Sequence, residues 1–329
     1  MREDTAGSIV TSICCITYNH EGYIAQALDG FLIQETSFPF EIIVGEDCSA
    51  DRTRHIVLEY QARYPQLIRL VTSETNVGMR QNGKRTRAAA RGKYIALCEG
   101  DDYWTDPCKL QKQVDFLDAH PECALCFHNV KLVYDDAAIE PRNLCAPDQK
   151  EISTLRDLLQ KNFIATCSVV FRSGLARELP PWYYELPMGD WPLHVLNAQH
   201  GTIGYLNDVM AVHRVHSEGA WSSLNRLQML QYDIQFYDRM MSHLGREYHA
   251  VIRGRLASRY GELAALYADT GDQALGRQCA LRSFTRRRLG QPALDTRFAA
   301  TVLRLWTPRL YKALRPLARR LLRRVKAVT

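Results

Sequence analysis

The 329-residue sequence has no uninterrupted apolar run of about 18 residues, the length that a membrane-spanning helix requires. Its first residues, MREDTAGS, contain no apolar stretch of signal-peptide length. Biased tracts are also missing, and contents of 46% hydrophobic and 24% charged residues are ordinary for globular proteins. These absences argue against fibrous and disordered classes and predict a soluble or peripheral protein.

Dense cysteine spacing, as in small secreted domains, is lacking although the chain has 10 cysteines. Cys123 and Cys126 form one CxxC pair without a clear second pair of ligands. A zinc site and a strand with two buried thiols both remain open for this pair. The overall cysteine pattern predicts a reducing, cytoplasmic location.

Acidic residues are missing after Asp295, where the chain has ten Arg and Lys. The net charge of +6 therefore belongs to this tail, and the part up to Asp295 carries −4. Because a nucleic-acid-binding protein would carry its basic surface within the folded body, this partner is not expected. The tail fits an amphipathic helix either on anionic lipid at the inner face of the membrane or docked on the body.

Apolar β-branched runs alternate with helical patterns in the first hundred residues. Strands are expected at 9–17, 40–47, 68–73 and just before 99–102, with helices at 23–34 and 51–65 between them. This order predicts an α/β fold with a Rossmann-like, mostly parallel central sheet flanked by helices. From Leu224 onward the pattern is helical, which predicts a catalytic domain at 1–223 and an all-helical C-terminal extension at 224–329, with a helical hairpin at 261–284.

Polar side chains follow three of the expected strands, namely Thr17-Tyr18-Asn19, Glu46-Asp47 and Glu99-Gly100-Asp101-Asp102. The carboxyl ends of parallel strands form the ligand-binding edge of such sheets, so these groups should meet in one crevice. The last cluster concentrates three carboxylates, whose repulsion a cation would offset. Oxygen ligands suit Mg²⁺ or Mn²⁺. The alternative is a helix N-terminus near Asp106-Pro107, where the dipole favours acidic residues.

At this point the sequence resembles the family 2 glycosyltransferases, which have the glycosyltransferase A fold. The matching segments are SICCITYNHEGYIAQALDGFLIQ, FEIIVGEDCSADRT, NVGMRQNGKRTRAAARGKYIALCEGDDYW and, more loosely, MGDWPLH. They follow the family's order and approximate spacing. The resemblance covers most of residues 8–130 and extends more weakly to about 220.

The resemblance implies a site for a nucleotide-diphosphate sugar, with UDP as the expected nucleotide. The residues expected to bind the donor are Thr17, Asn19, Glu46, Asp47, Asn76, Lys84, Arg85, Glu99, Asp101, Asp102 and Arg214. Asp101, Asp102 and His216 would hold the metal ion, while the role of His213 is left open. Cys48 departs from the family, which commonly has glycine there. For Lys84 and Arg85, solvated helix charges are an equal alternative.

Asp190, in MGDWPLH, is the expected general base, because inverting transfer needs a carboxylate that removes the proton of the acceptor hydroxyl. The family usually has Glu before this residue, whereas Gly189 stands here. A helix N-cap is the alternative for Asp190. Trp104 and Trp191 follow the two acidic motifs and fit either sugar stacking or core packing.

Together these features predict a metal-dependent, inverting glycosyltransferase with a glycan or lipid-linked acceptor. A nucleotidyltransferase would share the fold and the acidic site, but such enzymes usually have a glycine-rich loop after the first strand, where this chain has YNHEG. A non-catalytic module that binds sugars or nucleotides is the second alternative.

Overall fold

A computed structural model describes residues 8–176, 178–217, 219, 221–286, 296–307 and 309. The chain divides into two compact units, Met1–Ser223 and Leu224–Thr329. The division falls where the sequence pattern becomes helical. The assignment of catalysis to the first unit stays a prediction.

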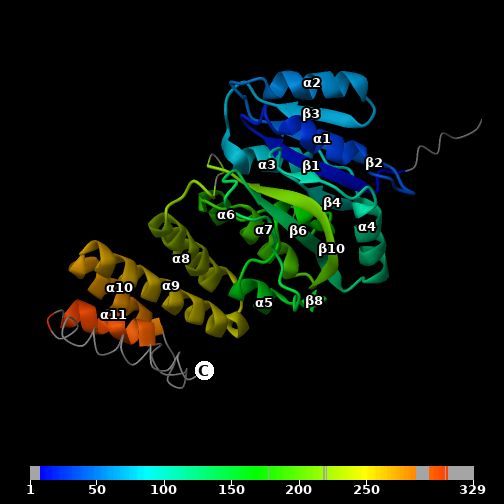
Figure 1. Ribbon diagram of the computed structural model, residues 1–329. Helices are drawn as coiled ribbons and strands as arrows, with labels where there is room; N and C mark the ends of the chain where they lie inside the picture. The colour runs from blue at the N-terminus through cyan, green and yellow to red at the C-terminus, as the bar shows by residue number, and fades with distance from the viewer. Residues whose placement is uncertain are drawn as a thin grey trace, which may run out of the picture. The chain divides into compact units, whose positions relative to one another are not determined.

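The first unit is built on a ten-stranded sheet whose main path has the order β3-β2-β1-β4-β9-β6-β10-β5 (Figure 1). The strands β1 to β4 pair in parallel, as do β6 and β10, whereas β9 is antiparallel to both β4 and β6. The predicted mostly parallel α/β sheet is confirmed. In path order the strands span Ile68–Thr72, Phe40–Glu46, Thr11–Thr17, Tyr94–Leu97, Val170–Arg172, Cys123–Tyr134, Thr202–Val215 and Tyr103–Trp104, and the short β7 (Arg142–Asn143) and β8 (Ile152–Ser153) pair with β6 and β10.

Helices cover both faces of this sheet because its strands are apolar on both sides. Inward residues of β1 and β2, such as Ile13 and Val44, form one core with α1 (Ile24–Leu32), α2 (Thr53–Arg63) and α4 (Lys109–Ala119). Side chains alternate along a strand, so Gly45 faces the opposite side, where α3 (Gly78–Ala88) packs. The remaining helical segments of this unit are α5 (Leu155–Gln160), η1 (Thr166–Ser168), α6 (Pro181–Glu185) and α7 (Asp190–Ala198).

Two alternatives from the sequence are not what the structure shows. The strand β5 separates the acidic cluster from α4, so Glu99, Asp101 and Asp102 do not lie in the first turn of that helix. Asp190 is the first residue of α7, and Gly189 is its N-cap. The acidic cluster therefore lies in the loop before β5, and Asp190 lies in the first turn of α7.

The CxxC pair lies in the buried strand β6. The thiol of Cys123 is 3.3 Å from the hydroxyl of Thr202, and the thiol of Cys126 lies 3.7 Å from the carbonyl of Gln113. Within the described residues, the possible metal-binding group that contains a cysteine involves Cys167 instead. The interpretation as two buried thiols therefore fits this strand.

The second unit contains α8 (Arg226–His243), η2 (Arg246–Tyr248), α9 (His249–Thr270), α10 (Gln273–Arg286) and α11 (Thr296–Trp306). The helices α9 and α10 form the expected hairpin, and Gly271 ends α9 with a φ of 91°, which favours glycine. None of the described helices is both long and apolar enough to cross a bilayer. Most of the expected basic amphipathic segment, after Arg309, lies outside the described residues.

Gly45 allows the close approach of β2 and α3, and its replacement by alanine should weaken the fold. A Cβ atom there would lie 1.9 Å from Oγ1 of Thr86 and 2.7 Å from Oδ1 of Asn82. We expect Gly45→Ala to lower the free energy of unfolding by about 1–3 kcal/mol, the usual cost of overpacking. Urea denaturation followed by circular dichroism measures the change. Gly22→Ala is the matched control, since nothing lies within 4 Å of its Cβ position; equal stabilities of the two variants would contradict the prediction.

Candidate active site

The three polar clusters expected to converge lie at neighbouring strand ends. β1 is flanked by β2 and β4 in the sheet, so the segments after Thr17, Glu46 and Leu97 emerge side by side. Two tight turns direct these segments, with a φ of 54° at Asn19 and 61° at Cys48. Such positive φ values favour glycine, which explains why the family commonly has glycine at the position of Cys48.

Glu46 and Asp47 are buried, and both form many polar contacts. Glu46 accepts hydrogen bonds from the Ser49 amide, at 2.6 Å, and from the Arg54 guanidinium. Burial alone would raise the pKa of Glu46, but these hydrogen bonds hold it below its usual value. Glu46 is therefore an ionised anchor for the loop after β2.

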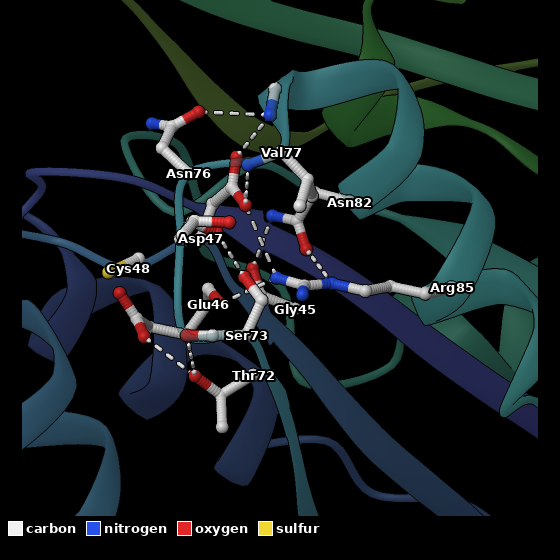
Figure 2. A network of polar contacts seen from close by, with 12 residues as sticks. Gly45, Glu46, Asp47, Cys48, Thr72, Ser73, Asn76, Val77, Asn82 and Arg85 are labelled. Atoms are coloured by element: carbon white, nitrogen blue, oxygen red, sulfur yellow. Dashed lines mark hydrogen bonds and ion pairs between the residues drawn. The ribbon is translucent and has the colours of Figure 1, made fainter.

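Asp47 binds the start of α3. Its two carboxylate oxygens accept from the amides of Val77 and Gly78, at 3.0 and 2.8 Å (Figure 2). Free amides and the helix dipole make this end of α3 favourable for an anion. Arg85 donates to the carbonyl of Glu46 at 2.7 Å and lies 3.3 Å from Asp47. Arg85 thus fixes the end of β2. A solvated helix charge, the alternative left open for this residue, would not make these contacts.

The other residues expected to bind the nucleotide differ in their hydrogen bonds and exposure. The hydroxyl of Thr17 is buried and has no hydrogen-bond partner among the described residues. Asn19 ties its loop to the next one, since its side-chain oxygen accepts from the amide of Ala50 at 2.9 Å. Asn76 caps the turn before α3 through the Gly78 amide, and Lys84 is exposed on α3, 5.5 Å from the ring of Tyr184.

The acidic cluster is arranged as two carboxylate–imidazole pairs. Oδ2 of Asp101 lies 3.1 Å from Nε2 of His216 and 3.9 Å from Nε2 of His20. Oδ2 of Asp102 lies 2.8 Å from Nδ1 of His213, and its Oδ1 accepts from the Arg214 amide. Asp102 is 1% exposed, whereas the Asp101 side chain is 17% exposed. Asp101 is therefore the more accessible of the two carboxylates.

The charges of this cluster compete strongly. Desolvation, followed by the negative charges of Asp101, Asp102 and Asp190, raises the pKa of Glu99 to about 8. Burial would also raise the pKa of Asp101, but the hydrogen bond from His216 and the charge of His20 lower it overall. A cation beside these carboxylates would favour their ionised forms, and Oδ1 of Asp101 is buried with no hydrogen-bond partner among the described residues. Carboxylate oxygen and imidazole nitrogen suit a divalent cation such as Mn²⁺.

Asp190 begins α7 and lies near this cluster, since its charge contributes to the raised pKa of Glu99. The side-chain amide of Asn162 donates to its carboxylate at 3.2 Å. Its role as general base stays a prediction.

Arg214 and the two tryptophans have mainly structural contacts. Arg214 donates to the Asp101 carbonyl and to Gln26, and its guanidinium lies 4.5 Å from the centre of the Tyr103 ring. Trp104 and Trp191 are 1% and 6% exposed, and each donates its indole N–H to a backbone carbonyl. Core packing is thus the interpretation that both tryptophans fit.

Three further residues near the site were not identified from the sequence. His20 reaches Asp101 from the loop after β1, Cys167 lies with Asp102 and His213 in one possible metal-binding group, and Arg80 contacts the loop before α7. His20 belongs to the YNHEG loop and could have been noticed there. Cys167 and Arg80 have no local pattern that distinguishes them from ordinary core and helix residues.

The family is decided by a match of residues 12–178 to the sequence profile of glycosyl transferase family 2. The chain belongs to this family. Its relatives include the uncharacterized protein Rv1520 of Mycobacterium tuberculosis, which is 48% identical over 216 residues, or 64% of this chain and 60% of that protein. The chain thus matches about three fifths of the length of this relative.

Two solved structures have a similar fold. The mannosyltransferase PcManGT from Pyrobaculum calidifontis, solved with GDP-Man and Mn²⁺, superimposes with a TM-score of 0.59 at 16% identity, covering 94% of this chain and 84% of that one. TarS from S. aureus, residues 1–349 with UDP-GlcNAc, gives a TM-score of 0.54 at 19% identity, covering 84% and 89%. The predicted glycosyltransferase A fold is confirmed.

The Asp102–His213 pair should make stability depend on pH. Burial lowers the pKa of His213, but the charge and hydrogen bond of Asp102 outweigh it and raise the pKa to about 9. Because the pKa of His213 is higher in the folded state, protonation of His213 stabilises the fold. This stabilisation is complete below the unfolded-state pKa of 6.5 and is lost as the pH rises through 9. Therefore His213→Gln should cost more stability at pH 6 than at pH 10. Urea unfolding at pH 6 and pH 10 tests this prediction, with the exposed His55 of α2, replaced in His55→Gln, as control. A loss of stability that is the same at both pH values would contradict it.

Proposed function

We propose that the chain transfers a sugar from a nucleotide-diphosphate donor, with UDP as the first candidate, to a hydroxyl of a glycan or lipid-linked acceptor. Transfer proceeds with inversion and depends on Mg²⁺ or Mn²⁺. The observation that carries this proposal is the Asp101–His216 pair at the end of β4, with one oxygen of Asp101 lacking a described partner. Family membership supports the donor class.

Asp101 and His216 would hold the ion, with Asp102 in the same cluster oriented by His213 and the Arg214 amide. When bound, a divalent ion offsets the charge of the diphosphate. Asp101 presents its accessible carboxylate, while the nearly buried Asp102 keeps the loop in place. This division of roles between adjacent acids follows from their different exposure.

Thr17, Asn19 and the pair Glu46-Asp47 would line the nucleotide pocket. The unpartnered Thr17 hydroxyl is the group on this side that is ready to accept a ligand hydrogen bond. Arg85 and Asn76 support the pocket wall, because they bind the end of β2 and the start of α3. The exposed Lys84 would be available to a phosphate.

Asp190 would act as the base. As the acceptor oxygen forms its bond to the anomeric carbon, the hydroxyl proton moves to the Asp190 carboxylate. The bond from that carbon to the diphosphate oxygen breaks, and its electron pair leaves with the nucleotide diphosphate. Asn162, which donates to Asp190, would orient the carboxylate for this transfer.

Donor binding should depend on Asp101. We expect calorimetry with UDP, UDP-GlcNAc and GDP-mannose to show binding that requires Mn²⁺ or Mg²⁺. Asp101→Asn should weaken it at least about tenfold, or 1.4 kcal/mol, since one charge at the ion is lost. Asp115→Asn, on the exposed face of α4, is the matched control. Absence of binding for every donor and ion would refute the enzymatic proposal.

Asp190 should matter for the chemical step and leave donor binding unchanged. Asp190→Asn should lower donor hydrolysis and transfer by roughly 10²–10⁴-fold, because an amide cannot accept the proton. Its affinity for UDP with Mn²⁺ should match that of the wild type. Rates are measured by release of the nucleotide diphosphate, and a fully active variant would remove Asp190 as the base.

A further inference from the structure

Arg80 connects the helix beside the nucleotide pocket to the loop that carries Asp190. It lies in the first turn of α3, and its Nε and Nη2 atoms both donate to the carbonyl of Leu186, at 3.1 and 2.9 Å. Leu186 is 106 residues further along the chain and follows α6 directly. A fork of two hydrogen bonds on one acceptor fixes the loop more strictly than a single bond would.

Gly189 provides the space that this guanidinium needs. A Cβ atom at position 189 would lie 2.7 Å from Nη1 of Arg80 and 3.2 Å from the hydroxyl of Tyr183. The same hydroxyl donates to the Gly189 carbonyl at 3.1 Å. The backbone directly before Asp190 is thus held at two carbonyls, those of Leu186 and Gly189.

The charged groups around Arg80 also bear on its role. It is partly buried and has no ion pair with a carboxylate among the described residues. The negative charges that act on it include those of Asp190 and Glu99. Removing a guanidinium from water without an ion-pair partner is costly, and the two hydrogen bonds to the Leu186 carbonyl offset part of this cost.

The helix that carries Arg80 is itself fixed to the nucleotide side. Asp47 binds the amides of Val77 and Gly78 at the start of α3, and Asn82 donates to the Gly45 carbonyl at 2.7 Å. A continuous set of hydrogen bonds therefore runs from the end of β2 through α3 to the loop before Asp190.

We propose that Arg80 is a positioning residue, which holds the Leu186–Gly189 loop so that Asp190 faces the donor sugar. Arg80 touches the loop backbone and acts on the reaction through Asp190. This inference rests on the proposed role of Asp190 as base. Its structural part, the anchoring of the loop, can be measured without any substrate.

Anchoring is tested by amide hydrogen exchange of the purified chain. In Arg80→Ala, exchange in residues 186–190 should rise at least roughly tenfold, because two hydrogen bonds to the loop are lost. Arg142→Ala removes an exposed arginine of β7 and should leave this segment unchanged. Unchanged exchange in Arg80→Ala would overturn the inference, whether or not any donor is turned over.

The catalytic part is tested on hydrolysis of UDP-GlcNAc and GDP-mannose with Mn²⁺. Arg80→Ala should lower kcat by roughly 100-fold, the scale of a base displaced by about 1 Å, with the donor KM unchanged. Millimolar guanidinium should restore part of the rate, which loss of folding would not allow. A raised KM with normal kcat would instead assign Arg80 to donor binding and overturn the proposal.

A double-mutant cycle adds a second criterion. Gly189→Ala should lower kcat in the wild type by displacing the guanidinium, but should have little further effect in Arg80→Ala, where that space is free. Additive losses would contradict the inference. If the wild type hydrolyses no donor, the proposed function fails on its own, and hydrogen exchange still decides the anchoring.

Discussion

Negative charge concentrated at the ends of three adjacent strands is the constraint on which the rest of this structure depends. Four of the five carboxylates have a partner of their own: Arg54 and the Ser49 amide for Glu46, the start of α3 for Asp47, His216 for Asp101 and His213 for Asp102. The Glu99 carboxylate has no such partner among the described residues, and burial together with the neighbouring carboxylates raises its pKa. These contacts therefore leave part of the negative charge of the site without compensation, and this remaining charge favours a bound cation.

The same contacts join elements that are distant in the sequence. Asp102, between β4 and β5, is tied to the end of β10 through His213, and Asp101 reaches His216 just beyond it. β5 pairs with β10 in the sheet, so the acidic loop closes against this strand. The residues expected to hold the ion therefore also join the loop after β4 to the end of β10.

Different levels of the fold were predictable to different degrees. The alternation of apolar runs and helical patterns identified the strands β1 to β4, since each is a short, mainly apolar segment whose signal is local. It did not show that β9 lies between β4 and β6 or that β5 follows the acidic cluster directly. A strand of 2 residues, such as Tyr103–Trp104, carries too few side chains to give a periodic signal.

The chemical groups of the site can be identified from the amino-acid sequence, because the acids after β2 and β4, the histidines at the end of β10 and Asp190 follow strands or open a helix in recognisable motifs. Their partners could be identified only from the folded chain: His216 with Asp101, His213 with Asp102, and Arg80 with the loop before Asp190. Neighbouring acids in the sequence look equivalent, and burial alone separates the 17% exposed Asp101 side chain from the nearly buried Asp102. Such long-range pairing depends on which strands meet in the sheet, and no local pattern encodes that.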